Sequence, residues 1–187
     1  MDERLPNPFL CNFATHLSEI RDRLGITQKV LAEKSGISKP TIVAIEGEPT
    51  RLSRTHALAL FFVITTELDQ KAATAKSIDY SNVAKAAATL AAAGFTAKIF
   101  NVTLGSMVGA LIAPAAARIA IPYLFRGKSS KKPDQTEHMD SVTLKNLATE
   151  SVGMIRKEIL QRLGIKSLSL QDFMAEIEKN EPEKNRG

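Results

Sequence analysis

"GITQKVLAEKSGISKPTIVAIEGEP", residues 25–49, carries the start and stop signals of two short helices in close succession. Thr27 suits the N-cap of the first helix and Ser38 that of the second, because a side-chain hydroxyl accepts a hydrogen bond from a backbone amide in the first turn. Gly36 lies between them, where glycine tolerates the positive φ that closes a helix. Pro40 falls in the first turn of the second helix, where its missing amide has no intrahelical partner to lose. The stretch therefore predicts two consecutive helices that meet at a sharp turn.

Helical patterning continues on both sides of this pair. Upstream, a helix from about residue 15 is expected to end before Gly25, and downstream Ser53 opens a longer helix over residues 53–68. One upstream stripe consists of Leu17, Ile20, Arg21 and Leu24, and Ile37, Ile42 and Ile45 fall at a spacing that directs them into a core. We therefore predict a compact helical domain over residues 15–70.

Residues 17–68 resemble the lambda-repressor-like, XRE-type helix-turn-helix family. The resemblance covers about a third of the chain, and residue type, spacing and context agree together in Thr27-Gln28, Leu31-Ala32, Gly36-Ile37-Ser38, Ile42 and Ile45-Glu46. Ala32 must be small because the second and third helices cross there at close range. The family implies an all-α fold, with a five-helix domain whose third helix enters the major groove of double-stranded DNA.

The resemblance also implies which exposed residues face DNA. The family's glutamine at the place of Gln28 begins the second helix and holds a phosphate, so Gln28 is expected to position the DNA backbone. Arg51 and Arg54 lie in and after the loop that follows the third helix, where further phosphate contact is expected. The residues expected to contact DNA are Thr27, Gln28, Ser38, Lys39, Pro40, Thr41, Val43, Ala44, Arg51 and Arg54.

The third helix departs from the polar pattern that is usual in the family. Lys39 could donate to guanine O6 and N7 or to phosphate, and Thr41 could reach a base or a phosphate oxygen. The apolar trio of Pro40, Val43 and Ala44 offers no side-chain hydrogen bond, although each could contact a thymine methyl group. A protein partner for this trio is the competing interpretation.

Composition and charge favour a helical protein with distinct segments. Hydrophobic residues make up 44% of the chain and charged residues 24%, as in ordinary globular proteins, while aromatics reach only 5%. The formal net charge of +5 divides into −1 for residues 1–70, +8 for residues 71–133 and −2 for residues 134–187. The basic excess therefore lies outside the segment that resembles a DNA-binding domain.

The segment over residues 71–126 is rich in alanine and glycine and is expected to be helical. Residues 99–117 carry no charge, and their length is near the roughly 20 residues that cross a bilayer. Small residues recur there every four positions, a ridge that lets another helix approach closely: Gly105, Gly109, Ala113 and Ala117. We expect this segment to serve oligomerisation or contact with a partner, and insertion into a membrane is an alternative.

Two further segments complete the predicted organisation. Residues 127–140 form a basic linker, and residues 141–180 form C-terminal helices. The last of these helices is opened by Ser169 and Asp172 as a capping pair. We expect the C-terminal half of the chain to contact a protein partner.

Nothing in the sequence favours an enzyme. Cys11 is the only cysteine, so neither a disulfide framework nor a cysteine-based zinc site is expected. His16, His56 and His138 are scattered, with no nucleophile or phosphate-binding glycine loop beside them, so no catalytic residue, metal site or cofactor is expected. The start of the chain lacks the features of a secretory signal. We therefore expect a cytoplasmic, nucleoid-associated protein.

The function predicted from these features is sequence-specific DNA binding by a bacterial or phage transcriptional regulator. A homodimer that binds a pseudo-palindromic operator fits this class of domain. Two alternatives remain at this point. One is an antitoxin-like or phage-encoded adaptor that uses a helix-turn-helix fold to bind protein, and the other is a membrane-tethered regulator.

Overall fold

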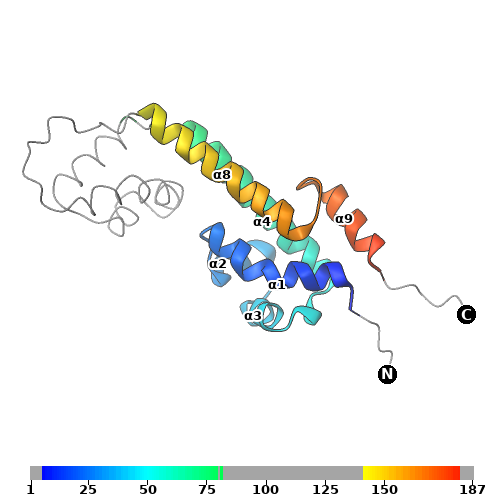
Figure 1. The fold of residues 1–187 in the computed structure, drawn as a ribbon. Helices are drawn as coiled ribbons and strands as arrows, with labels where there is room; N and C mark the ends of the chain where they lie inside the picture. Colours follow the sequence, from blue (N-terminus) through cyan, green and yellow to red (C-terminus); the bar gives the residue numbers. More distant parts are fainter. Residues whose placement is uncertain (1–5, 80, 82–140, 182–187) are drawn as a thin grey trace, which may run out of the picture. The chain divides into compact units, whose positions relative to one another are not determined.

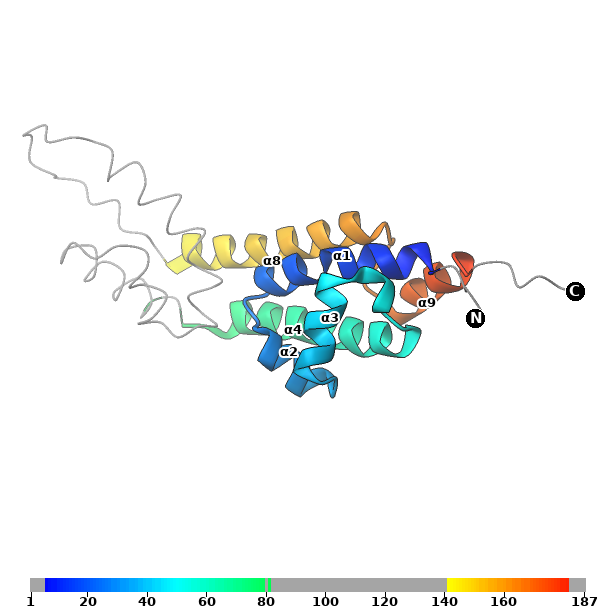
Figure 2. The same ribbon diagram turned by 90° about the horizontal axis from the view of Figure 1, so that it is seen from below.

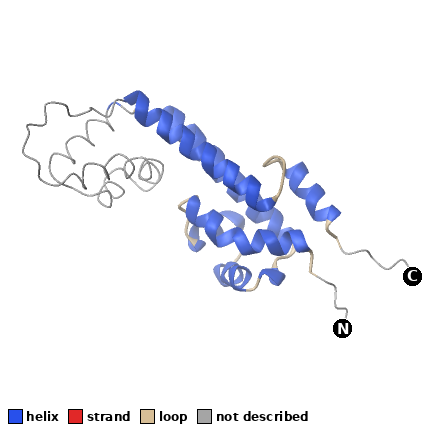
Figure 3. Ribbon diagram, in the orientation of Figure 1, coloured by secondary structure: helices blue, strands red, loops and turns tan. Residues whose placement is uncertain are grey.

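The computed structural model describes residues 6–79, 81 and 141–181 of the 187-residue chain. Every regular element among these residues is a helix, and the described ranges contain no strand (Figure 3). The elements are α1 (Pro8–Arg23), α2 (Gln28–Ser35), α3 (Lys39–Gly47), the short 3-10 helix η1 (Pro49–Arg51), α4 (Arg54–Ser77), α8 (Ser141–Leu163) and α9 (Leu170–Lys179). The prediction of an all-α fold is confirmed for the described residues.

Several sequence predictions fall on residues outside the described ranges. These include the basic linker, residues 127–140, and almost all of the Ala/Gly-rich region after residue 81. The small residues expected to serve oligomerisation also lie there: Gly105, Gly109, Ala113 and Ala117. In the part of the chain that the structure describes, no helix is both long and apolar enough to span a membrane.

The helix ends around the central pair follow the predicted signals. The hydroxyl of Thr27 accepts a hydrogen bond from the Val30 amide at 3.2 Å and caps α2. Gly36 closes α2 with a φ of 70°, in the left-handed region that glycine enters without a Cβ clash. Ser38 then caps α3 by accepting from the amide of Thr41 at 3.3 Å. These local signals fix the turn between the two helices.

Two helices extend beyond their predicted bounds. The first begins at Pro8 rather than near residue 15, because Asn7 Oδ1 accepts hydrogen bonds from the amides of Phe9 and Leu10 and caps it. Proline suits the first helical position because it needs no amide partner there. At the other end, α4 continues to Ser77, nine residues past the predicted end at residue 68.

The chain divides into two compact units: Met1–Leu68 together with Ile155–Gly187, and Asp69–Met154. From the sequence, the C-terminal helices, residues 141–180, are expected to form a segment of their own. In the structure, α9 and the last part of α8 belong with α1, α2, α3 and the first part of α4. The first unit is therefore assembled from both ends of the chain.

Aromatic packing joins the C-terminal helix to the N-terminal helices within that unit. Phe173 of α9 is fully buried and stacks on Phe61 of α4, with ring centroids 4.0 Å apart and an interplanar angle of 11°. Phe9 and Phe13 of α1 each meet Phe173 edge to face at 5.3 Å. Both views place α9 beside the start of α1 (Figures 1 and 2). Burial of a phenylalanine side chain stabilises a fold by about 2 kcal/mol or more. Through Phe173, α9 is therefore part of the core.

Polar contacts reinforce this packing at two further points. The side-chain amide of Asn7 donates to the carbonyl of Ile177 in α9 at 2.9 Å. The side-chain amide of Asn12 donates to the carbonyl of Arg162 near the end of α8, also at 2.9 Å. Arg162 forms an ion pair with Glu19 of α1. Both C-terminal helices are thus held against α1 by polar contacts, and α9 by aromatic contact as well.

The second unit contributes the end of α4 and the start of α8 to the described residues. Ala75 of α4 is buried, as are Ala148 and Val152 of α8. Lys71 is also buried, which is unusual for a lysine and requires that its ammonium group be satisfied.

Candidate nucleic-acid interface

The outer face of α3 presents several of the side chains predicted to contact DNA. Lys39 and Pro40 are exposed at the start of the helix, and Val43 is 47% exposed one turn further on. Thr41 and Ala44 are half-buried. The opposite face, with Ile42 and Ile45, is buried. The helix is therefore anchored by one side and offers the other to solvent.

Ser38 and Thr41 form a closed polar pair at the start of α3. Their hydroxyl oxygens lie 2.7 Å apart, and Ser38 also accepts from the Thr41 amide. A hydroxyl has one donor and two acceptor positions, so the pair can still accept or donate one contact to an approaching group. Its first role in the free protein is to hold the first turn of α3.

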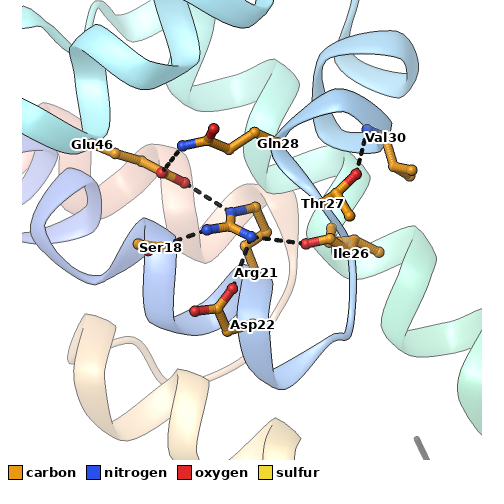
Figure 4. Close-up of polar contacts among 8 residues, drawn as sticks. All are labelled: Ser18, Arg21, Asp22, Ile26, Thr27, Gln28, Val30 and Glu46. Atoms are coloured by element: carbon orange, nitrogen blue, oxygen red, sulfur yellow. Dashed lines mark hydrogen bonds and ion pairs between the residues drawn. The ribbon is translucent and has the colours of Figure 1, made fainter. Parts of the chain in front are cut away.

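Glu46 of α3 holds the side chain of Gln28, the expected phosphate contact on α2 (Figure 4). Its side-chain amide donates to Glu46 Oε2 at 2.6 Å, and Glu46 Oε1 accepts from Arg21 Nε of α1 at 2.9 Å. Arg21 also donates to the carbonyl of Ile26 at 3.0 Å. We call Arg21, Gln28 and Glu46 the polar bracket, because they connect α1, α2 and α3.

The polar bracket is largely removed from solvent. The side chain of Arg21 is 14% exposed and that of Glu46 only 9%. A charge-assisted pair at this depth has well-defined geometry, since each ion needs the other to offset its desolvation. The amide nitrogen of Gln28 carries two hydrogens, so it can donate one to Glu46 and the other to a phosphate. The polar bracket can therefore orient the side chain of Gln28 and still leave one of its amide hydrogens for a phosphate.

The two arginines expected to contact phosphate are both engaged in ion pairs. Arg51, at the end of η1, pairs with Glu48 three residues earlier, and both side chains are exposed. Arg54, the first residue of α4, pairs with Glu178 at 3.0 Å and with Glu181 at 2.9 Å. The Arg51 pair is local in the sequence, whereas the Arg54 pairs come from the opposite end of the chain.

Sequence reasoning missed the partners that hold these residues. Arg21 offered a signal, because a charged residue on the apolar stripe of α1 implies a buried counterion. Glu46 was recognised only as part of the motif. For Glu178 and Glu181 no local pattern connects them with Arg54, because that contact depends on where α9 packs. Among the described residues, no group of three or more His, Cys, Asp or Glu side chains gathers into a site that could hold a metal ion.

Comparison with known proteins identifies the central segment. Residues 17–60 match the model of a helix-turn-helix family, which confirms the lambda-repressor-like, XRE-type resemblance for that segment. The matched range runs from α1 through α2, α3 and η1 into α4. A search of curated proteins and a search of solved structures each found no match.

Proposed function

We propose that this chain, whose residues 17–60 form a DNA-binding helix-turn-helix of the lambda-repressor-like, XRE type, is a sequence-specific transcriptional regulator that binds a pseudo-palindromic operator as a homodimer. The observation that carries the proposal is the presentation of α3. Its inner face is buried, the polar bracket fixes its orientation against α1 and α2, and its outer face is open.

The proposed mode of binding places α3 in the major groove. Lys39 stands at the entering end, where it can donate to guanine O6 and N7, and Val43 faces outward where it can contact a thymine methyl group. Gln28 would hold a backbone phosphate on one side of α3, and Arg51 another on the side of the following loop. Phosphate contacts set the register, and the α3 side chains read the bases.

A homodimer follows from how little sequence one copy can read. The nine residues of α3 extend roughly 14 Å, since an α-helix rises about 1.5 Å per residue. At about 3.4 Å per base pair this length covers some four base pairs, too few to define one operator. Two copies related by a two-fold axis double the readout and produce a pseudo-palindrome.

The decisive experiment is selection of duplexes from a random library by the purified full-length protein at two salt concentrations. The proposal expects an enriched pseudo-palindrome that is retained at the higher salt. Lys39→Ala should change the enriched bases, whereas Lys166→Ala, in the turn between α8 and α9, should leave them unchanged. Binding that shows no enrichment and disappears with salt would contradict sequence-specific regulation.

The apolar trio, with Pro40 and Val43 exposed and Ala44 half-buried, supports a second candidate, a helix-turn-helix adaptor that binds protein. Val43 is the exposed large aliphatic side chain of α3, and Pro40 lies beside it in the first turn. Replacing Pro40, Val43 and Ala44 together by serine distinguishes the two functions. Loss of DNA affinity in this variant supports readout through α3, and unchanged DNA affinity with loss of a protein partner supports the adaptor.

A further inference from the structure

We infer that the C-terminal helix acts as an internal competitor for DNA, because Glu178 and Glu181 occupy the guanidinium group with which Arg54 would otherwise contact a phosphate. The inference rests on the proposed function, since it concerns the regulation of the same surface. All the residues involved belong to the unit formed by Met1–Leu68 and Ile155–Gly187.

The geometry of Arg54 is that of a filled anion site. Its Nη2 lies 3.0 Å from Glu178 Oε1, and its Nη1 lies 2.9 Å from Glu181 Oε1. These two nitrogens form the edge of the guanidinium that binds a phosphate in bidentate fashion. Each therefore donates to a carboxylate oxygen in the free protein, and a phosphate can take this edge only by displacing both glutamates.

The charge of the segment reinforces the competition. Residues 170–181 contain four acids, Asp172, Glu176, Glu178 and Glu181, against the single lysine Lys179, which gives a net charge of −3. A DNA phosphate approaching Arg54 would meet this negative charge at short range. The segment thus combines direct occupation of the arginine with repulsion of its alternative ligand.

The carboxylates of Glu178 and Glu181 are held in place by a helix that is anchored in the core. Phe173 and Ile177 on the inner face of α9 are buried, and Asn7 donates to the Ile177 carbonyl at 2.9 Å. Glu178 follows directly on the outer side of the helix, and Glu181 lies just past its end. The packing of α9 therefore sets the position of both acids relative to Arg54.

The two ion pairs of Arg54 are strong enough to compete with a DNA phosphate and weak enough for a phosphate to displace them. Glu178 is 60% exposed and Glu181 52% exposed, so water screens both pairs. Solvent-exposed ion pairs of this kind contribute about 0.2–1 kcal/mol each. The acids should therefore raise the DNA concentration needed for binding, and should not abolish binding.

The test compares the wild-type chain with E178Q/E181Q in equilibrium binding to the selected operator over a range of salt. The double variant should bind about three- to tenfold more tightly at low salt, and the slope of log K against log salt should become steeper by about 0.9, the value for one added phosphate contact. The gain should disappear in the triple variant R54A/E178Q/E181Q, which lacks the arginine that is released.

A charge-matched control is available at the other junction of the C-terminal helices. Glu19 and Glu158 both pair with Arg162, where α8 meets α1. E19Q/E158Q removes the same number of negative charges and weakens the contact of α8 with α1, without touching Arg54. Its operator affinity should change by less than about twofold.

The outcomes separate the inference from the proposed function. If the wild-type chain and E178Q/E181Q both fail to bind any duplex, the proposed function fails. If the wild-type chain binds but E178Q/E181Q gains nothing, or the gain persists without Arg54, or E19Q/E158Q matches it, the competition is refuted while the function stands. Thermal melting of each variant verifies its fold; if the double variant melts below the assay temperature, E178Q and E181Q tested singly should each show a smaller gain.

Discussion

Phe173 of α9 lies flat against Phe61 of α4, at a centroid distance of 4.0 Å, although the two residues stand in opposite parts of the sequence. The helix-turn-helix domain is therefore closed by a helix from the C-terminus. We expect Phe173→Ala to lower the free energy of unfolding by about 3–5 kcal/mol, because it leaves a cavity among buried aromatic rings. Chemical denaturation followed by circular dichroism measures the loss.

Leu170→Ala, in the first turn of the same helix, is the matched control. Leu170 is an exposed large apolar residue, so its truncation should change the free energy of unfolding by less than about 0.5 kcal/mol. Similar losses for the two variants would mean that α9 does not share the core of the N-terminal helices.

The polar bracket gives a second prediction. Glu46→Gln removes the carboxylate between Arg21 and Gln28, which leaves the nearly buried guanidinium of Arg21 with the more exposed Asp22 carboxylate, 2.8 Å away, as its remaining counterion. We expect a loss of about 1–3 kcal/mol in the free energy of unfolding, the cost of depriving nearly buried polar groups of a hydrogen-bond partner. Glu33→Gln, which breaks an exposed pair with Lys29 on α2, should cost less than about 0.5 kcal/mol. Equal effects in thermal or chemical denaturation would argue against a stabilising bracket.

Lys39 permits a test of how α3 meets DNA. If Lys39 donates to a base, Lys39→Ala should cost about 1–3 kcal/mol on the selected operator and relax the preference at one base position. If it donates to a phosphate, affinity should fall about equally for all duplexes and the salt slope should decrease by about one. Fluorescence anisotropy on operator and scrambled duplexes separates the two results. No change on either duplex would remove Lys39 from the interface.

Two glycines should respond with opposite signs to the same substitution. Gly36→Ala should lower the free energy of unfolding by about 1 kcal/mol, because its φ of 70° is unfavourable for a residue with a Cβ, although no neighbouring atom lies within 4 Å of the added group. Gly153 lies inside α8 with equally open space around it and no positive φ. Gly153→Ala should therefore stabilise the protein by about 0.5–1 kcal/mol. Melting curves of the two variants should shift in opposite directions.

Because the first unit is built from both ends of the chain, it constrains the topology of any membrane attachment. Its two parts, Met1–Leu68 and Ile155–Gly187, fold together, so both ends of the intervening unit return to the same body. A segment between them that entered a bilayer would have to cross it an even number of times. Cysteines introduced at Lys29 and Lys179 in a Cys11→Ser background should therefore react with an impermeant thiol reagent from the same side, and labelling from opposite sides would contradict the joint unit.

Much of the helix-turn-helix segment could be predicted from its sequence because its determinants are local. The caps at Thr27, Ser38 and Ser169 act within three residues, and the turn at Gly36 depends on one backbone angle. The buried and exposed faces of α3 likewise follow from helical spacing. Even the early start of α1 has a local cause in its N-cap Asn7, although the apolar stripe further along the helix predicts a later start.

The amino-acid sequence by itself determined the presence of the main helices, the caps of α2, α3 and α9, the turn between α2 and α3, and the family of residues 17–60, because each depends on short-range geometry and on spacing along the chain. Only the tertiary structure decided that α9 completes the core around Phe173, that Glu46 accepts a hydrogen bond from Gln28, and that Glu178 and Glu181 pair with Arg54. Such contacts join residues far apart in sequence. They form where packing of buried apolar surface brings helices together, and no local pattern encodes that arrangement.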